Sequence, residues 1–237
     1  KYDYFAGIFR VCPIVDHSPG FEAYYPRGKI SIATEILEGN LTYSEGLAKV
    51  LTACSTCMNC AQQCGSTDTK GDPLLNTARI IEAMRADIID LGLAPEPYVV
   101  ISSRTEKNYN PYAESHEKRT KWAEGLDAQF GKSNNIYFVG GASSYRRKEI
   151  ATDTVKILKK LNIPFSILKD EWCCGSPLWR TGARKLAEKM AKHNVEALKD
   201  AKTVITSCAG CARAFLKDYP EIVGDMPFEV LHMTEFL

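Results

Sequence analysis

Four cysteines within eleven residues constrain this chain more than any other feature. They form the spacing C-x2-C-x2-C-x3-C inside the segment "ACSTCMNCAQQCG", and five further cysteines lie elsewhere in the 237 residues. An odd total, a long chain and gaps of two or three residues do not match the disulfide scaffold of a small secreted protein. The pattern indicates metal ligands in a reducing compartment, so we expect a cytoplasmic location. The nine cysteines are Cys12, Cys54, Cys57, Cys60, Cys64, Cys173, Cys174, Cys208 and Cys211.

The run at residues 54–64 has the spacing of bacterial ferredoxins, in which three close thiolates surround one side of a [4Fe–4S] cube. The fourth cysteine of such a run ligates another cluster, because it enters a helix that leads away from the first cube. That cube then takes its last thiolate from a distant cysteine, usually one followed by proline, and Cys12-Pro13 matches this description. We therefore predict one [4Fe–4S] cluster with the ligands Cys12, Cys54, Cys57 and Cys60.

A second cube of the ferredoxin type is not expected, because its ligands are missing. In the register upstream of Cys12, the three corresponding positions hold Tyr2, Phe5 and Ile8, which could fill the vacated space with apolar side chains. Only Cys64 would remain for that cube, and one thiolate does not hold a cluster, so Cys64 is interpreted as a remnant thiol. Two alternatives stay open: a zinc site at the same run, and an ordinary buried role for Cys12.

The pattern along the chain predicts α+β architecture in two domains, which suits a chain of this length. Residues 1–94 form a helical, ferredoxin-like domain with helices at 27–39, 44–53 and 71–92. Ser44 and Asp72 are their expected caps, and Pro73 suits the first position of the third helix. Residues 95–134 are a polar, irregular connecting segment with a helix near its end.

Residues 135–237 alternate strand and helix, which predicts an α/β domain with a small parallel sheet. Ligands of such sheets bind at the carboxyl ends of the strands. Gly141, the pair Cys173-Cys174 and Cys208 each follow a predicted strand, so we expect a site there. The strands are predicted at 136–141, 164–168, 203–207 and 228–232, and the helices at 147–162, 182–201 and 211–219.

The second group of cysteines consists of Cys173-Cys174-Gly175 and the pair Cys208-x2-Cys211. Adjacent cysteines rarely form a disulfide with each other because the ring is strained, but each can donate a thiolate to a metal or cluster. A predicted helix begins near the second pair, and its free N–H groups stabilise thiolates. This site is predicted to hold a second iron–sulfur cluster or zinc.

Other readings of this second group remain open. The four thiols could be structural cysteines in the reduced state, or Cys208 and Cys211 could form a thioredoxin-like redox pair. His232 lies beside the end of the last predicted strand, where it could approach the site or serve only in packing.

The overall composition excludes several classes of function. The net charge of +1 gives no general attraction to nucleic acid or anionic lipid, although peripheral membrane association stays open. No stretch approaches eighteen apolar residues, so no membrane span is expected. The first residues lack the pattern of a secretory signal, and the absence of an initial Met is expected if a segment precedes them.

The order of these motifs resembles the CCG-domain iron–sulfur family. Its members include the D subunit of heterodisulfide reductase, the glycolate oxidase iron–sulfur subunit and the C subunit of anaerobic glycerol-3-phosphate dehydrogenase. The matching residues are Cys12-Pro13, Pro26-Arg27-Gly28, Cys54, Cys57, Cys60, Cys64, Asn110-Pro111, Arg119, Trp122, Cys173-Cys174-Gly175, Ser207-Cys208 and Cys211.

The resemblance implies an iron–sulfur electron-transfer subunit of a larger, anaerobic oxidoreductase complex. A flavoprotein dehydrogenase or heterodisulfide-reductase-like subunits would be its partners. The family's CCG half binds a noncubane [4Fe–4S] cluster, or in some copies zinc or an ordinary cluster. Here Gly141 occupies the position of the family's first CCG-domain cysteine, and one CCG domain is visible where two are usual. We therefore do not expect this chain alone to reduce a heterodisulfide.

Two functions from other classes compete with electron transfer. In the first, the CCG site binds zinc and the chain is a structural module that docks a partner. In the second, the cysteines carry no metal and the chain is a thiol–disulfide enzyme. The metal content of the protein separates these hypotheses.

Overall fold

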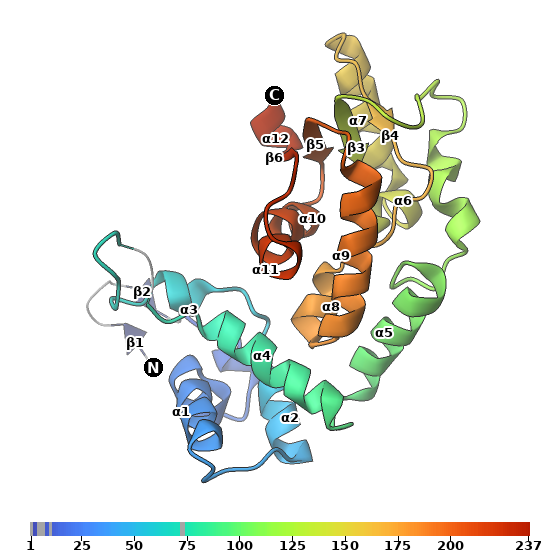
Figure 1. The fold of residues 1–237 in the computed structure, drawn as a ribbon. Coiled ribbons are helices and arrows are strands. Elements are labelled where there is room, and N and C mark those ends of the chain that lie inside the picture. Colours follow the sequence, from blue (N-terminus) through green and yellow to red (C-terminus); the bar gives the residue numbers. More distant parts are fainter. Residues whose placement is uncertain (1, 4–7, 10, 72–73) are drawn as a thin grey trace. The chain divides into compact units, whose positions relative to one another are not determined.

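The computed structural model describes residues 2–3, 8–9, 11–71 and 74–237 (Figure 1). The chain splits into two compact units, the first made of residues 1–98 with 180–182 and the second of residues 99–179 with 183–237. Within the described residues, none of the helices has the length and apolar character needed to cross a bilayer.

The first unit is mostly helical. Its core joins α1, α2 and α4, with Leu51, Ile81 and Ile88 among the fully buried side chains. Tyr2 and Ile8, two positions that lack a ferredoxin ligand, lie on a two-stranded antiparallel sheet, whereas Phe5 lies outside the described residues. The elements are β1 (Tyr2–Asp3), β2 (Ile8–Phe9), η1 (Val15–His17), η2 (Glu22–Tyr24), α1 (Pro26–Leu37), α2 (Glu45–Thr52), α3 (Asn59–Gln62) and α4 (Thr77–Asp90).

The helix starts in this unit agree only partly with the sequence prediction. The cap of α2 is confirmed, because the Ser44 hydroxyl accepts a hydrogen bond from the backbone N–H of Leu47 at 3.2 Å. The predicted start of α4 at residue 71 is wrong. The helix begins at Thr77, because the Asn76 side chain accepts the N–H of Arg79 at 3.1 Å and caps it there. The expected residues Asp72 and Pro73 lie outside the described part of the chain.

Gly28 allows the close approach of α1 to η2. A Cβ atom at this buried position would overlap the backbone carbonyl group of Glu22. We expect Gly28→Ala to lower the free energy of unfolding by about 1–3 kcal/mol, the usual range for overpacking. Gly46→Ala is the matched control, because its Cβ would meet only the Ser44 hydroxyl at 3.8 Å, and alanine in a helix is about 0.5–1 kcal/mol better than glycine. Urea unfolding followed by circular dichroism measures both, and equal effects would contradict the close approach.

The second unit contains a four-stranded parallel sheet in the order β4-β3-β5-β6. This confirms the predicted parallel sheet and the α+β class of the chain. The strands are β3 (Asn135–Phe138), β4 (Ser166–Ile167), β5 (Thr203–Thr206) and β6 (Glu229–His232). The helices are α5 (Glu96–Asn108), η3 (His116–Ala123), α6 (Gly141–Tyr145), α7 (Lys148–Lys160), α8 (Ser176–Thr181), α9 (Arg184–Leu198), α10 (Ala209–Arg213), η4 (Ala214–Asp218), α11 (Tyr219–Val223) and α12 (Met233–Phe236).

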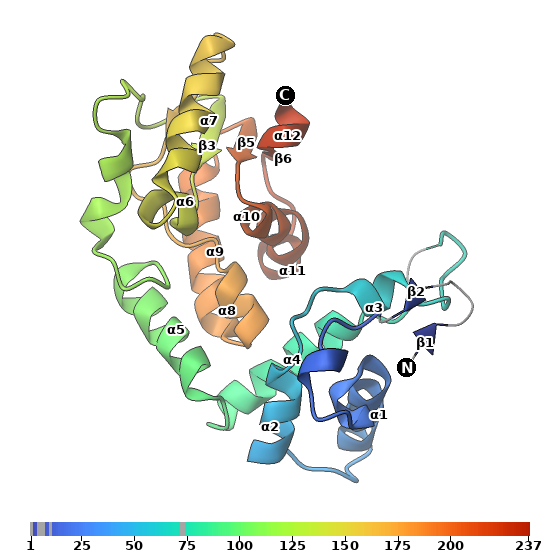
Figure 2. The same ribbon diagram turned by 180° about the vertical axis from the view of Figure 1, so that it is seen from behind.

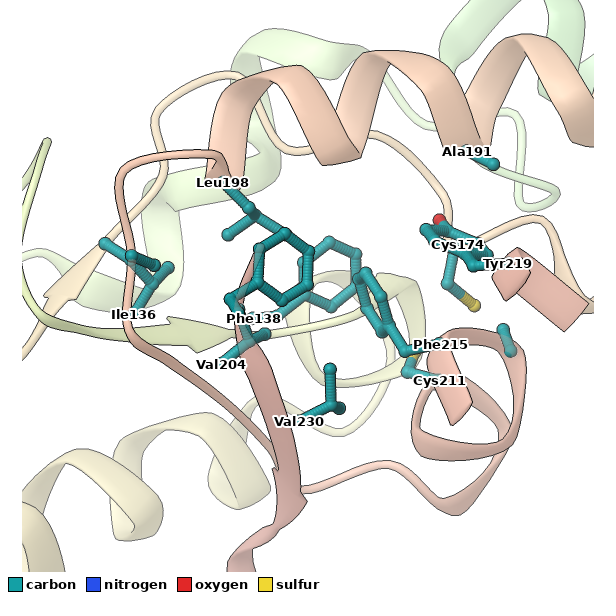
Figure 3. Close-up of a cluster of buried hydrophobic side chains, with 13 residues drawn as sticks. Ile136, Phe138, Cys174, Ala191, Leu198, Val204, Cys211, Phe215, Tyr219 and Val230 are labelled. Carbon is teal, nitrogen blue, oxygen red and sulfur yellow. The ribbon is translucent and has the colours of Figure 1, made fainter. Parts of the chain in front are cut away.

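Helices cover both faces of this sheet, as Figures 1 and 2 show for α9 and α7. Alternate strand residues point to opposite faces, so Ile136 and Phe138 pack under α9, α10, η4 and α11. Tyr137 and Val139 pack instead under η3, α7 and α12. In the close-up of the first face, Cys174 and Cys211 lie near Tyr219, away from the Ile136 end of the cluster (Figure 3).

The segment 95–134 is more ordered than its polar sequence predicts. A helix of 13 residues, α5, replaces the expected irregular chain. Most of its exposed residues are polar, while Ile101 packs against the core that contains Leu178 and Trp179. Tertiary packing thus stabilises a helix whose sequence has only a weak apolar face. The helix expected near the end of the segment is the 3₁₀-helix η3.

Candidate metal centres

One pocket of the first unit gathers four cysteines from two distant parts of the sequence. It is lined by Cys12 together with Cys54, Cys57 and Cys60. Cys57 is exposed and the other three are half-buried. Four sulfur donors around one largely apolar pocket fit a [4Fe–4S] cluster, which takes four thiolates.

The backbone between these cysteines follows a tight path. Thr56 and Met58 have left-handed φ angles of 50° and 66°. Residues other than glycine rarely adopt such angles, and those that do cluster at functional sites. The N–H of Thr56 donates to the Cys54 sulfur at 3.3 Å. The Asn59 amide donates to the carbonyl oxygen of Val11 at 2.5 Å and thereby tethers the segment of Cys12 to α3.

Cys64 does not line this pocket. It follows α3, where its backbone N–H donates to the carbonyl oxygen of Ala61 at 3.2 Å. Its thiol is half-buried and free. This position accords with the interpretation of Cys64 as a remnant thiol and leaves the pocket to the four predicted ligands.

Two buried cations, Arg85 and Lys29, lie beside this loop. Arg85 is 3% exposed and its guanidinium donates to the carbonyl oxygens of Leu51, at 2.8 Å, and of Cys54. It therefore holds the entry to the cysteine loop. Lys29 is 2% exposed and lines the pocket itself. Burial lowers the pKa of Lys29, while negative charge on Cys54, Cys12 and Cys60 acts in the opposite direction.

The second group of cysteines lies at the carboxyl edge of the parallel sheet. Cys208 follows β5, Cys173 and Cys174 follow β4, and the glycines 140–141 follow β3. In the order β4-β3-β5-β6, the connection that follows β3 leads to one side of the sheet and the connection that follows β5 leads to the other. Such a switch point is where open α/β sheets bind ligands.

Hydrogen bonds connect the four sulfurs of this group. Cys173, Cys174 and Cys211 are buried, and Cys208 is half-buried. Hydrogen bonds from the thiols of Cys173 and Cys211 hold the pKa of Cys174 well below its usual value. A thiol hydrogen bond from Cys211 lowers the pKa of Cys208 to about 6, although burial opposes it. The same hydrogen bonds raise the pKa of Cys173 and Cys211 well above the usual value; the thiolate is the form that binds metal.

The loop after β3 approaches these sulfurs closely. A Cβ atom at Gly140, whose φ is 77°, would lie 2.9 Å from the Cys211 sulfur, so only glycine fits there. A Cβ at Gly141 would instead meet the ring of Tyr112 at 3.3 Å. Tyr112 therefore occupies the space in front of Gly141, the position at which the family resemblance implied a cysteine.

A buried ion pair stabilises the loop after β3. Glu171 is 1% exposed and accepts hydrogen bonds from the backbone N–H groups of Val139, at 2.7 Å, and Gly140, at 2.9 Å. The same carboxylate pairs with the guanidinium of Arg119, which is 2% exposed. The Glu171 carboxylate thus connects the segment before Cys173 to the turn beside Cys211.

A second set of side chains holds the backbone of the cysteine pair. Asn194 is fully buried, and its amide donates to the carbonyl oxygen of Cys173 at 3.1 Å and to the Tyr219 hydroxyl at 3.2 Å. The ring of Trp172 stacks between Tyr109 and His193, with centroid separations of 4.0 and 3.7 Å. These contacts fix the backbone at Cys173 and thereby the direction of its side chain.

His232 has a local structural role. It is the N-cap of α12: its ring Nδ1 contacts the Thr234 hydroxyl at 2.8 Å, and its backbone N–H donates to the Glu235 carboxylate at 2.8 Å. All nine cysteines are free. Within the part of the chain that the structure describes, no group of three His, Cys, Asp or Glu side chains is arranged to hold a single metal ion.

The supporting residues of both centres were not singled out in the sequence. Lys29, Arg85, Glu171 and Asn194 are charged or amide residues in helical or loop segments, where such residues are usually solvated. Their roles depend on burial, which the local pattern does not show. Asn110 is an exception, since Asn110-Pro111 is among the residues that carry the family resemblance, and its side chain organises the loop of residues 108–114 that carries Tyr112.

Comparison with known proteins identifies the second unit. Residues 136–215 match the family model described as the CCG cysteine-rich domain. The segment includes all four cysteines of the second group and the loop after β3. The second unit therefore contains a CCG cysteine-rich domain. No solved structure matches the chain.

Several relatives extend the likeness across the first unit. The D subunit of dihydromethanophenazine:CoB–CoM heterodisulfide reductase from Methanosarcina acetivorans is 36% identical over 224 residues, covering 91% of this chain and 52% of the relative. The B subunit of the CoM/CoB fumarate reductase from Methanothermobacter marburgensis is 26% identical, covering 95% and 44%. The C subunit of anaerobic glycerol-3-phosphate dehydrogenase from Escherichia coli is 28% identical, covering 68% and 39%. The chain spans about half the length of the first of these relatives.

Proposed function

We propose that this chain is an iron–sulfur electron-transfer subunit of an anaerobic oxidoreductase complex, similar to the D subunit of heterodisulfide reductase. The first unit is a ferredoxin-like module whose [4Fe–4S] cluster is held by Cys12, Cys54, Cys57 and Cys60. Flavoprotein or heterodisulfide-reductase-like subunits supply the substrate chemistry. The free thiols suit a reducing, cytoplasmic setting.

The observation that carries this proposal is the pocket of the first unit. Cys12 is separated from Cys54 by more than forty residues, yet both line one pocket with Cys57 and Cys60. If the thiols were buried without a common role, Cys12, the cysteine followed by proline, would not be expected to share a pocket with the three closely spaced cysteines. The gathering supports four-thiolate ligation of one group.

The second centre, at Cys173, Cys174, Cys208 and Cys211, is proposed to hold a second iron–sulfur cluster. Its support is the hydrogen-bonded set of four sulfurs and Gly140, which lets the loop after β3 approach the Cys211 sulfur closely. Zinc at this centre is the competing assignment, since four thiolates also satisfy zinc, but the described side chains form no group arranged to hold a single metal ion.

An iron–sulfur cluster bound at these sites supplies one-electron transfer. The residues of the chain determine where and how readily it occurs. Cysteine thiolates fix the cluster, apolar neighbours such as Ile81 exclude water from the pocket, and N–H groups directed at sulfur, as from Thr56, stabilise negative charge. Arg85 and Glu171 hold the two cysteine loops in position.

Metal analysis of the protein purified without oxygen tests this proposal. We expect about four iron and four acid-labile sulfide per occupied cluster, hence about eight of each if both centres hold one, with an EPR signal on reduction. Zinc without iron would instead support the docking module, and a metal-free protein would support the thiol–disulfide enzyme. Either result would overturn electron transfer as the function.

A further inference from the structure

A lysine side chain lies in the cluster pocket with no acidic partner among the residues that the structure describes. Lys29 is 2% exposed, and it lines the pocket together with Cys12, Cys54, Cys57 and Cys60. Its ammonium group donates to the backbone carbonyl oxygen of Tyr24 and lies 5.9 Å from the centre of the Tyr24 ring. A carbonyl and a ring face offer it only partial negative charge.

Burial of an ammonium group in such surroundings is costly unless an anion compensates it. The nearest groups that can carry a full negative charge are the sulfurs of the pocket, which become thiolates when they bind a metal. Arg85 adds a second positive charge nearby, held on carbonyl oxygens of the loop. The lysine therefore has a charge partner only when the pocket holds an anionic group.

We propose that Lys29 is the internal counterion of the cluster in the first unit and raises its reduction potential. This inference rests on the proposed cluster at Cys12, Cys54, Cys57 and Cys60. Reduction adds one electron, delivered by a redox partner, to a group that is already anionic because of its four thiolates. A fixed positive charge in the same water-poor pocket stabilises the reduced form more than the oxidised form, since the reduced form carries more negative charge.

Lys29→Met tests the charge, because methionine is apolar, unbranched and of similar length. The measurement is the midpoint potential of the first cluster, from an EPR-monitored redox titration, with iron and sulfide content determined on the same samples. We expect full iron content and a reduction equilibrium at least tenfold less favourable, which is a potential lower by about 59 mV for one electron. Lys29→Arg keeps the charge and should remain close to the parent value.

Lys49→Met is the matched control, because it removes the same charge from an exposed site on α2 of the same unit. Water and salt screen that charge, so its loss should change the potential far less. An unchanged potential in Lys29→Met with full iron content would overturn the proposal, and so would a shift equal to that of Lys49→Met.

Failure of the cluster to assemble is also informative. If Lys29→Met and Lys29→Gln both lose iron while Lys29→Arg keeps it, positive charge is needed to hold the anionic cluster, which supports the counterion role. If all three variants lose iron, the lysine acts by shape and the proposal is wrong. Absence of iron from the parent protein would instead overturn the proposed function itself.

Discussion

Cys57→Ser should remove the cluster of the first unit while leaving the metal of the second unit in place. Serine retains the size of the side chain, but its hydroxyl does not ionise as a thiol does and so supplies no comparable anionic ligand. Cys57 is exposed, so the substitution leaves the core packing unchanged. We expect the iron and sulfide content to fall by about four atoms each, with loss of the corresponding EPR signal.

Cys64→Ser is the control for this experiment. Cys64 belongs to the same cysteine run, yet it does not line the pocket, so its replacement should leave the iron content unchanged. Loss of iron from Cys64→Ser would contradict the ligand assignment. Emptying of both centres in Cys57→Ser would contradict the independence of the two units.

Glu171→Gln should destabilise the second unit strongly and empty its cysteine centre. The substitution leaves the Arg119 guanidinium buried without its carboxylate and weakens the acceptor for the N–H groups of Val139 and Gly140. Removal of one partner from a buried ion pair typically costs about 3–5 kcal/mol. Urea unfolding measures the loss of stability, and metal analysis of the folded fraction at low temperature measures the effect on the centre.

Glu149→Gln provides the comparison with an exposed pair. Glu149 pairs with Arg147 at 2.5 Å, and both side chains are more than half exposed. Such pairs contribute little because solvent already stabilises both charges. We therefore expect no measurable change in unfolding or in metal content. Similar behaviour of the two variants would show that Glu171 does not support the loop beside Cys211.

Local patterns were sufficient where the chemistry depends on spacing along the chain. The three-residue gaps of Cys54, Cys57 and Cys60 and the Cys-Pro at residue 12 predicted which sulfurs share a pocket, and the structure brings these four together. The alternation of strands and helices after residue 135 predicted the parallel sheet, because the spacing of the apolar residues distinguishes each strand from each helix. The start of α4 and the presence of α5 were missed, since a cap at Asn76 and packing around Ile101 decided them.

The sequence by itself determined which cysteines are candidate ligands, because the residue types and short gaps that permit thiolate ligation are visible in one dimension. Only the tertiary structure decided what surrounds those donors. Burial turned Lys29 and Glu171 from ordinary charged residues into groups whose charge must be compensated nearby. The close approach of Gly140 to the Cys211 sulfur, and of Tyr112 to Gly141, likewise depends on segments that are far apart in the chain. Electrostatic interactions and steric fit act across space, so the sequence pattern at one position does not contain them.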